Sequence, residues 1–93
     1  MSELNKTLEI YRDTHRNCSN YNNIKEVLNQ LLVIGFNNEN KPNELPDEFM
    51  INSVHFNESN FNSLMLDIGF KVKTQEKFVD FYSQLFTYVV TII

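Results

Sequence analysis

The spacing of apolar residues changes in the middle of this chain, and that change limits the folds open to it. Before Phe36, apolar residues recur three and four positions apart, which is the period of one face of an α-helix. Between Phe49 and Val72 they are interspersed or alternate with polar residues, as in β-strands. Because the chain has only 93 residues, we expect one small domain over residues 1–93. The pattern predicts an α+β fold.

Two helices are predicted in the N-terminal half. The first follows Ser2, which can cap it, and its apolar face is Leu4, Leu8, Tyr11 and His15. The second follows a cap at Asn22 or Asn23, and Gly35 is expected to end it as the glycine after the last turn. Its apolar stripe is Ile24, Val27, Leu28, Leu31, Leu32 and Ile34. Residues 37–47, rich in Asn and Pro, read as a polar loop.

A β-hairpin is predicted after this loop. Its first strand runs from Phe49 to Phe56, the turn is residues 57–60, and five alternations from Leu64 to Val72 indicate the second strand. Thr74 then caps a C-terminal amphipathic helix that extends to about Val90. Residues 87–93 are β-branched enough for a strand, so helix and strand both stay open there. The predicted order is α-α-β-β-α.

A two-stranded sheet is marginally stable alone and leaves two unpaired edges. The predicted C-terminal helix also carries more aromatic residues than a core of this size needs. We therefore expect a homodimer, formed through that helix or through a strand edge.

The sequence offers little for catalysis. Its lone cysteine, Cys18, forms no internal disulfide, and no Cys/His cluster suggests a zinc site. His15 and Cys18 lie three residues apart on one helix face and could form a thiolate–imidazole pair or bind a metal, but a packed histidine and a packed cysteine are the favoured interpretation. The two glycines, Gly35 and Gly69, are too far apart for a phosphate-binding loop. We expect no enzyme, no cofactor, no metal and no catalytic residue.

Charge and hydropathy limit the kinds of partner that the protein can bind. No apolar stretch approaches the roughly 18 residues that cross a bilayer, and the first residues do not resemble a secretory signal. The net charge is −4, without a basic stripe, which disfavours direct binding to nucleic acid. We expect a cytoplasmic protein without a membrane or nucleic-acid partner.

The negative charge is concentrated in the middle of the chain. Residues 1–37 are neutral, residues 68–93 carry +1, and residues 38–67 carry −5. The candidate partner-binding residues are the acids of this middle segment: Glu39, Glu44, Asp47, Glu48, Glu58 and Asp67. An acidic patch attracts a basic surface and speeds association with it. The alternative is that these acids only solvate a loop.

The composition also suggests an origin. Asn occurs 14 times and Ala is absent, which indicates AT-rich coding DNA of the kind found in bacteriophages and other mobile elements. A small acidic chain from such a genome is typical of anti-defence or anti-restriction inhibitors. We expect it to mask the basic nucleic-acid-binding surface of a host nuclease or DNA-binding protein, partly as a DNA mimic. The alternatives are an immunity protein that neutralises a nuclease toxin, and a structural subunit that assembles through its C-terminal helix.

Overall fold

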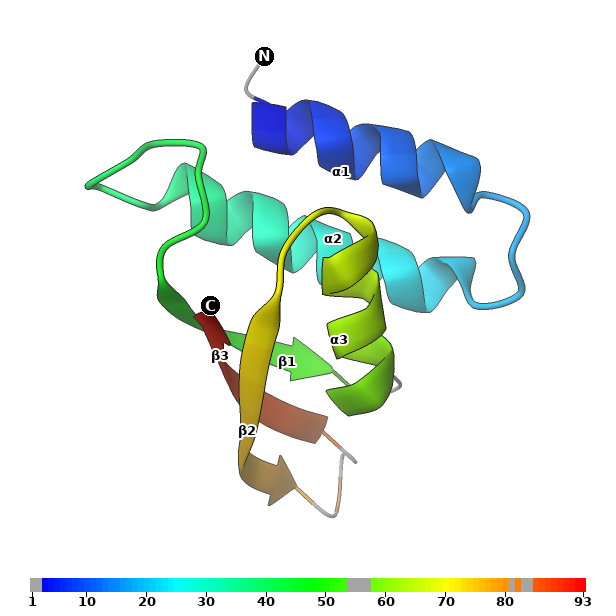
Figure 1. Ribbon diagram of the computed structural model, residues 1–93. Helices are drawn as coiled ribbons and strands as arrows, with labels where there is room; N and C mark the ends of the chain where they lie inside the picture. The colour runs from blue at the N-terminus through cyan, green and yellow to red at the C-terminus, as the bar shows by residue number, and fades with distance from the viewer. Residues whose placement is uncertain (1–2, 54–57, 81, 83–84) are drawn as a thin grey trace. The chain divides into compact units, whose positions relative to one another are not determined.

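The computed structural model of the protein describes residues 3–53, 58–80, 82 and 85–93. The chain divides into two compact units, Met1–Pro46 and Asp47–Ile93, which are considered one at a time. Within the described residues, two helices make the first unit, and three strands with one helix make the second, in the order α-α-β-α-β-β (Figure 1). The predicted α+β class is confirmed.

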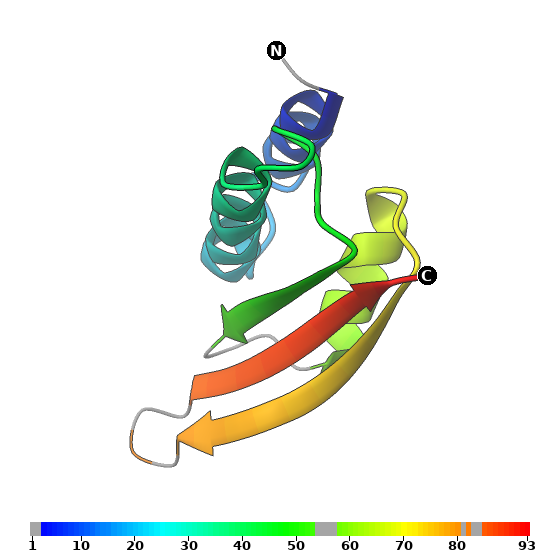
Figure 2. The ribbon, with the colours of Figure 1, turned by 90° about the vertical axis from the view of Figure 1, so that its left-hand side faces the viewer.

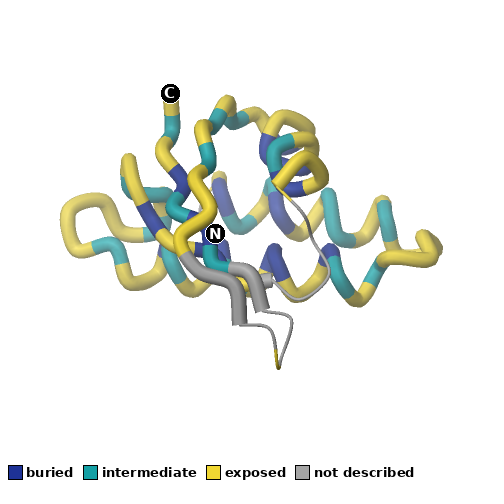
Figure 3. The backbone as a smooth tube through the Cα atoms, turned by 90° about the horizontal axis from the view of Figure 1, so that it is seen from below, coloured by how far each residue is buried: buried dark blue, intermediate teal, exposed yellow. Residues whose placement is uncertain are grey.

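The first unit is a helical hairpin of α1, Glu3–Thr14, and α2, Tyr21–Phe36 (Figures 1 and 2). Both predicted N-terminal helices are therefore confirmed. Their apolar faces supply the buried side chains of this unit, which are Leu4, Leu8, Ile24, Val27, Leu28 and Leu31. Buried and exposed positions follow one another along the helices, as expected for amphipathic segments (Figure 3).

The ends of α2 differ from the prediction. The helix begins at Tyr21, after Asn20, rather than after Asn22 or Asn23. Gly35 does not end the helix but lies inside its last turn and is buried. A Cβ atom on Gly35 would come within 2.8 Å of the Leu4 side chain and 3.7 Å of the Asn43 backbone. Gly35 is therefore explained by close packing of α1 and the loop after α2 against this turn, not by a left-handed backbone.

The second unit is built on an antiparallel sheet of three described strands: β1, Glu48–Ser53; β2, Val72–Asp80; and β3, Leu85–Ile92. β3 is the central strand and pairs with β1 on one side and β2 on the other (Figure 2). Because side chains alternate along a strand, one face of the sheet is buried. Its buried side chains on β1 and β3 are Phe49, Ile51, Tyr88 and Val90.

Helix α3, Glu58–Asp67, lies against β2 and replaces residues 64–67 of the predicted second strand. The predicted first strand is confirmed for residues 49–53, whereas residues 54–57 lie outside the described part. The strand predicted over 64–72 is wrong, as is the turn at 58–60. The buried side chains of this segment are Phe61, Leu64, Met65 and Ile68, with spacings of three, one and three residues. Leu66, which alternation places beside Leu64, is 61% exposed. The burial pattern of this segment therefore follows the period of a helix and not that of a strand.

Gly69 ends α3 with the geometry that had been expected of Gly35. Its φ is 98°, in the left-handed region, and its N–H donates to the carbonyl of Leu66 at 3.0 Å. The N–H of Phe70 donates to the carbonyl of Met65 at 2.8 Å. These two bonds form a Schellman motif, in which glycine is the favoured residue after the helix.

The predicted C-terminal helix is wrong, because its segment forms the hairpin of β2 and β3. The strand alternative left open for residues 87–93 is confirmed for 87–92. The physical reason is strand pairing: β3 pairs with the distant β1 on one edge and with the neighbouring β2 on the other, and its alternation buries Tyr88 and Val90 while Thr91 stays exposed. The register shifts between Glu76 and Phe78, which marks a bulge or irregularity in β2.

Substitution of two leucines in α3 distinguishes helix from strand. Leu64→Ala should lower the free energy of unfolding by about 3 kcal/mol, because it removes a buried side chain. Leu66→Ala should change it by less than about 1 kcal/mol, because that side chain is exposed. Urea denaturation followed by circular dichroism measures both. Equal losses would contradict the helix, since a strand places both leucines on one face.

The backbone of Gly69 gives a second test. Gly69→Ala should destabilise the protein by about 1 kcal/mol, because an L-residue is strained at this φ although space for its Cβ is open. Gly69→Asn should cost less, since Asn tolerates the left-handed region. The same urea titration compares them. A stabilised Ala variant would argue against the helix end described above.

Candidate functional site

The six acids selected from the sequence are all exposed, and they are divided between the two units. Glu39 and Glu44 belong to the loop that follows α2 in the first unit. Asp47 and Glu48 open the second unit at the start of β1. Glu58 and Asp67 occupy the two ends of α3, about 13 Å apart along its axis. The sequence therefore identified exposed carboxylates without showing how the fold distributes them.

Side-chain and backbone hydrogen bonds hold the loop after α2 in a defined conformation. The Asn38 amide Nδ2 donates to the Glu44 carbonyl at 2.9 Å, and its Oδ1 accepts from the Asn40 and Lys41 N–H groups at 3.2 and 3.4 Å. The Asn43 N–H donates to the Gly35 carbonyl at 2.9 Å. Asn is favoured at such positions because its short side chain substitutes for backbone in a turn. The loop that carries Glu39 and Glu44 is thus internally bonded.

Asn43 contributes a second feature to this loop. Its φ is 66°, a left-handed conformation that Asn adopts more readily than most residues. The next residue, Glu44, donates its N–H to the Lys41 carbonyl at 3.1 Å, which closes a turn. Asn-rich composition, which had suggested only a polar connection, is therefore explained in part by turn geometry.

Ion pairing distinguishes these acids from Asp13 of α1. Asp13 is paired with Arg16 at 3.0 Å and lies 3.8 Å from the Arg12 Nε. Within the described part of the chain, ion pairs engage none of four carboxylates in the middle of the sequence, which are Glu39, Glu44, Asp47 and Glu48. Among the described residues, no cation therefore holds any of these four carboxylates in an ion pair.

A second acidic group, which the sequence did not reveal, lies beside the buried face of the sheet. Glu58 accepts a hydrogen bond from the Thr74 hydroxyl at 2.6 Å, and Glu76 lies two residues further along β2. Glu76 pairs across the strands with Tyr88. Burial raises the pKa of the Tyr88 hydroxyl, and the carboxylates of Glu76 and then Glu58 raise it further. Glu76 was missed because its segment had been assigned to a helix, where no such pairing exists.

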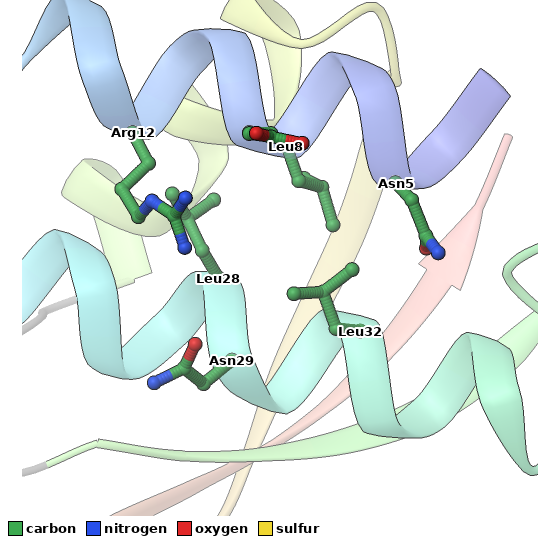
Figure 4. Close-up of a pocket in the computed structure, with 7 residues that line it drawn as sticks. Asn5, Leu8, Arg12, Leu28, Asn29 and Leu32 are labelled. Carbon is green, nitrogen blue, oxygen red and sulfur yellow. The ribbon is translucent and has the colours of Figure 1, made fainter. Parts of the chain in front are cut away.

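A shallow groove runs between α1 and α2 (Figure 4). Leucines from both helices line it, and the Arg12 side chain extends from α1 toward α2 beside them. The complete lining is Asn5, Leu8, Glu9, Arg12, Leu28, Asn29 and Leu32. Its volume of about 200 Å³ is below the roughly 300 Å³ at which small-molecule sites begin. The groove is therefore a poor fit for a nucleotide-sized cofactor.

His15 and Cys18 fall in the turn after α1. The His15 Nδ1 lies 2.8 Å from the Tyr11 carbonyl, to which it can only donate, and the two rings stack with centroids 4.0 Å apart. The Cys18 N–H donates to the His15 carbonyl, and Cys18 itself is exposed. His15 is thus partly buried, as interpreted from the sequence, whereas the interpretation of Cys18 as a packed residue is wrong. Among the described residues, no group of three His, Cys, Asp or Glu side chains is arranged to hold a metal ion.

Comparison with protein-family models, with curated proteins and with solved structures gave no match. In the described part of the chain, no helix combines the length and the apolar character needed to cross a membrane. Inference about function therefore depends on the residues and geometry given above.

The environment of Tyr88 predicts a pH dependence. Because its pKa is raised in the folded state, the unfolded chain loses this proton first, so stability should fall as pH rises above about 10. Ultraviolet absorbance titration should show a late transition to which Tyr88 contributes. Glu76→Gln should lower the pKa of Tyr88, whereas Tyr82→Phe, at a fully exposed position, should leave the late transition intact. Loss of that transition in Tyr82→Phe would contradict the assignment.

Proposed function

We propose that the protein is a non-catalytic inhibitor that binds another protein and masks a basic, nucleic-acid-binding surface. The docking element is the acidic segment, residues 39–48, which contains Glu39, Glu44, Asp47 and Glu48. The observation that carries the proposal is the exposure of all four carboxylates without an ion pair in the described part of the chain. Lys41 is the only basic residue within the segment, so the net charge of residues 39–48 is −3.

Electrostatics favours a basic partner for such a segment. Unpaired carboxylates that lie close together along the chain attract an oppositely charged surface and raise the association rate. They also disfavour nucleic acid itself, because its phosphates would be repelled. A basic groove that normally receives phosphates presents the complementary charge.

The bonded structure of the loop adds to the proposal. Asn38 and Asn43 hold the backbone that carries Glu39 and Glu44, so less backbone freedom is lost when these acids meet a partner. An unstructured polar connection would give no such advantage. This ordering favours a binding role over simple solvation of the loop.

A matched pair of double variants tests this function. Glu39→Gln with Glu44→Gln removes two charges from the acidic segment, and Glu9→Gln with Glu26→Gln removes two exposed charges from α1 and α2. Each immobilised protein is incubated with a bacterial lysate, and bound proteins are eluted with salt or with heparin as a soluble polyanion. A nucleic-acid-binding protein eluted by heparin is then purified, and its affinity for each variant is measured.

The first double variant should bind this partner about fivefold more weakly, since exposed charge pairs contribute about 0.5 kcal/mol each. The control variant should bind as the unaltered protein does. The unaltered protein should also displace DNA from the partner. Equal binding by both double variants, or capture that neither salt nor heparin reverses, would exclude the electrostatic docking.

A further inference from the structure

The two outer strands of the sheet differ in how their edges are protected. Within the described residues, β1 and β2 each pair only with β3, so each has one edge without a strand partner. β2 carries Lys73 and Lys77, both exposed, and has the register shift between Glu76 and Phe78. Lysines and bulges are the common means by which an edge strand avoids further pairing. The β2 edge is therefore protected against pairing with a further strand.

The β1 edge lacks these protections. Its pairing with β3 runs from Glu48↔Thr91 to Ser53↔Phe86 without a register shift. The strand contains no proline and no lysine, and its one charged residue stands at its first position. Its central residue on the open face, Met50, is 57% exposed. A regular edge with an apolar centre, residues 49–51, can pair with another strand.

We propose that a second copy of the chain pairs with this edge, so that β1 lies antiparallel to β1 of its partner and the sheet continues across a two-fold axis at Met50. This inference does not rest on the proposed inhibitory function: it shares Glu48 with the acidic segment, but its test leaves all four acids of that segment unchanged. The sequence of β1 favours a second copy of the same chain as the partner, because the strand is complementary to itself in one register. A two-fold pairing of this type is isologous, so each residue meets its match on the other copy.

The register follows from the alternation of side chains. Residues that face each other in an antiparallel pair project on the same face, so the axis must pass through a residue. With the axis at Met50, Phe49 faces Ile51 on the buried face, Met50 faces itself on the open face, and Glu48 faces Asn52. Every pair then joins apolar to apolar or polar to polar. With the axis at Ile51, Met50 would face Asn52 and Phe49 would face Ser53, which mismatches both.

Charge placement agrees with the same register. Each Glu48 faces a neutral Asn52, and the two Glu48 residues stand at opposite ends of the paired segment, about 13 Å apart along the strands. Like charges directly opposite each other would destabilise the pair, and this arrangement avoids them. The single acid of β1 thus does not oppose the dimer.

The test compares two variants: one places a charge at the two-fold axis, and the other places it at a matched position on the protected β2 edge. Met50 and Gln75 both pair with Val89 and lie on the open face, one on each outer strand, and both are exposed. Met50→Lys would bring two lysines face to face in the dimer, whereas Gln75→Lys would not. Both are made with Cys18→Ser, so that the exposed cysteine cannot link two chains. Sedimentation equilibrium measures the dimer dissociation constant.

We expect the Cys18→Ser protein to be dimeric, Met50→Lys to raise the dissociation constant at least about tenfold, and Gln75→Lys to leave it unchanged. Mixing Met50→Lys with Met50→Glu should restore a heterodimer, because opposite charges then meet at the axis. Circular dichroism confirms that each variant is folded. A monomer at all concentrations would overturn the proposal, as would a dimer indifferent to Met50→Lys or a β1 edge that accepts only a strand of another protein.

Discussion

The second unit depends on the central position of β3. This strand satisfies its backbone on both edges and places Tyr88 and Val90 on the face that also carries Phe49 and Ile51. Its two partners lie far from each other in the sequence, so the sheet exists only when the C-terminal segment returns to pair with β1. The raised pKa of Tyr88 and its proximity to Glu58 and Glu76 follow from that pairing.

The two glycines show how one residue type serves different physical needs. Gly69 supplies a left-handed backbone at the end of α3, where the absence of a Cβ relieves strain. Gly35 has no such backbone and instead leaves room for Leu4 in the first unit. The sequence offered a helix-ending role for Gly35 and none for Gly69, because the position of a glycine does not show whether its backbone or its missing side chain matters.

The proposed function is based on exposed charge. The acidic segment presents carboxylates without a cation from the described chain, and Asn38 orders the loop that carries two of them. The β1 edge shares Glu48 with that segment, but it is defined by backbone groups and alternation rather than by charge. The two proposals are therefore tested by different substitutions.

The sequence by itself determined the two N-terminal helices, the α+β class, the first strand and the exposed acids, because these depend on local periodicity and polarity. It did not determine α3 or the C-terminal hairpin. Leu64 fits both a period of two and a helical stripe with Phe61 and Ile68, and the segment after Val72 has both an amphipathic pattern and β-branched residues. Only tertiary structure resolved these ambiguities, since the pairing of β3 with the distant strand β1 and the burial of one face of α3 are non-local interactions that no short window contains.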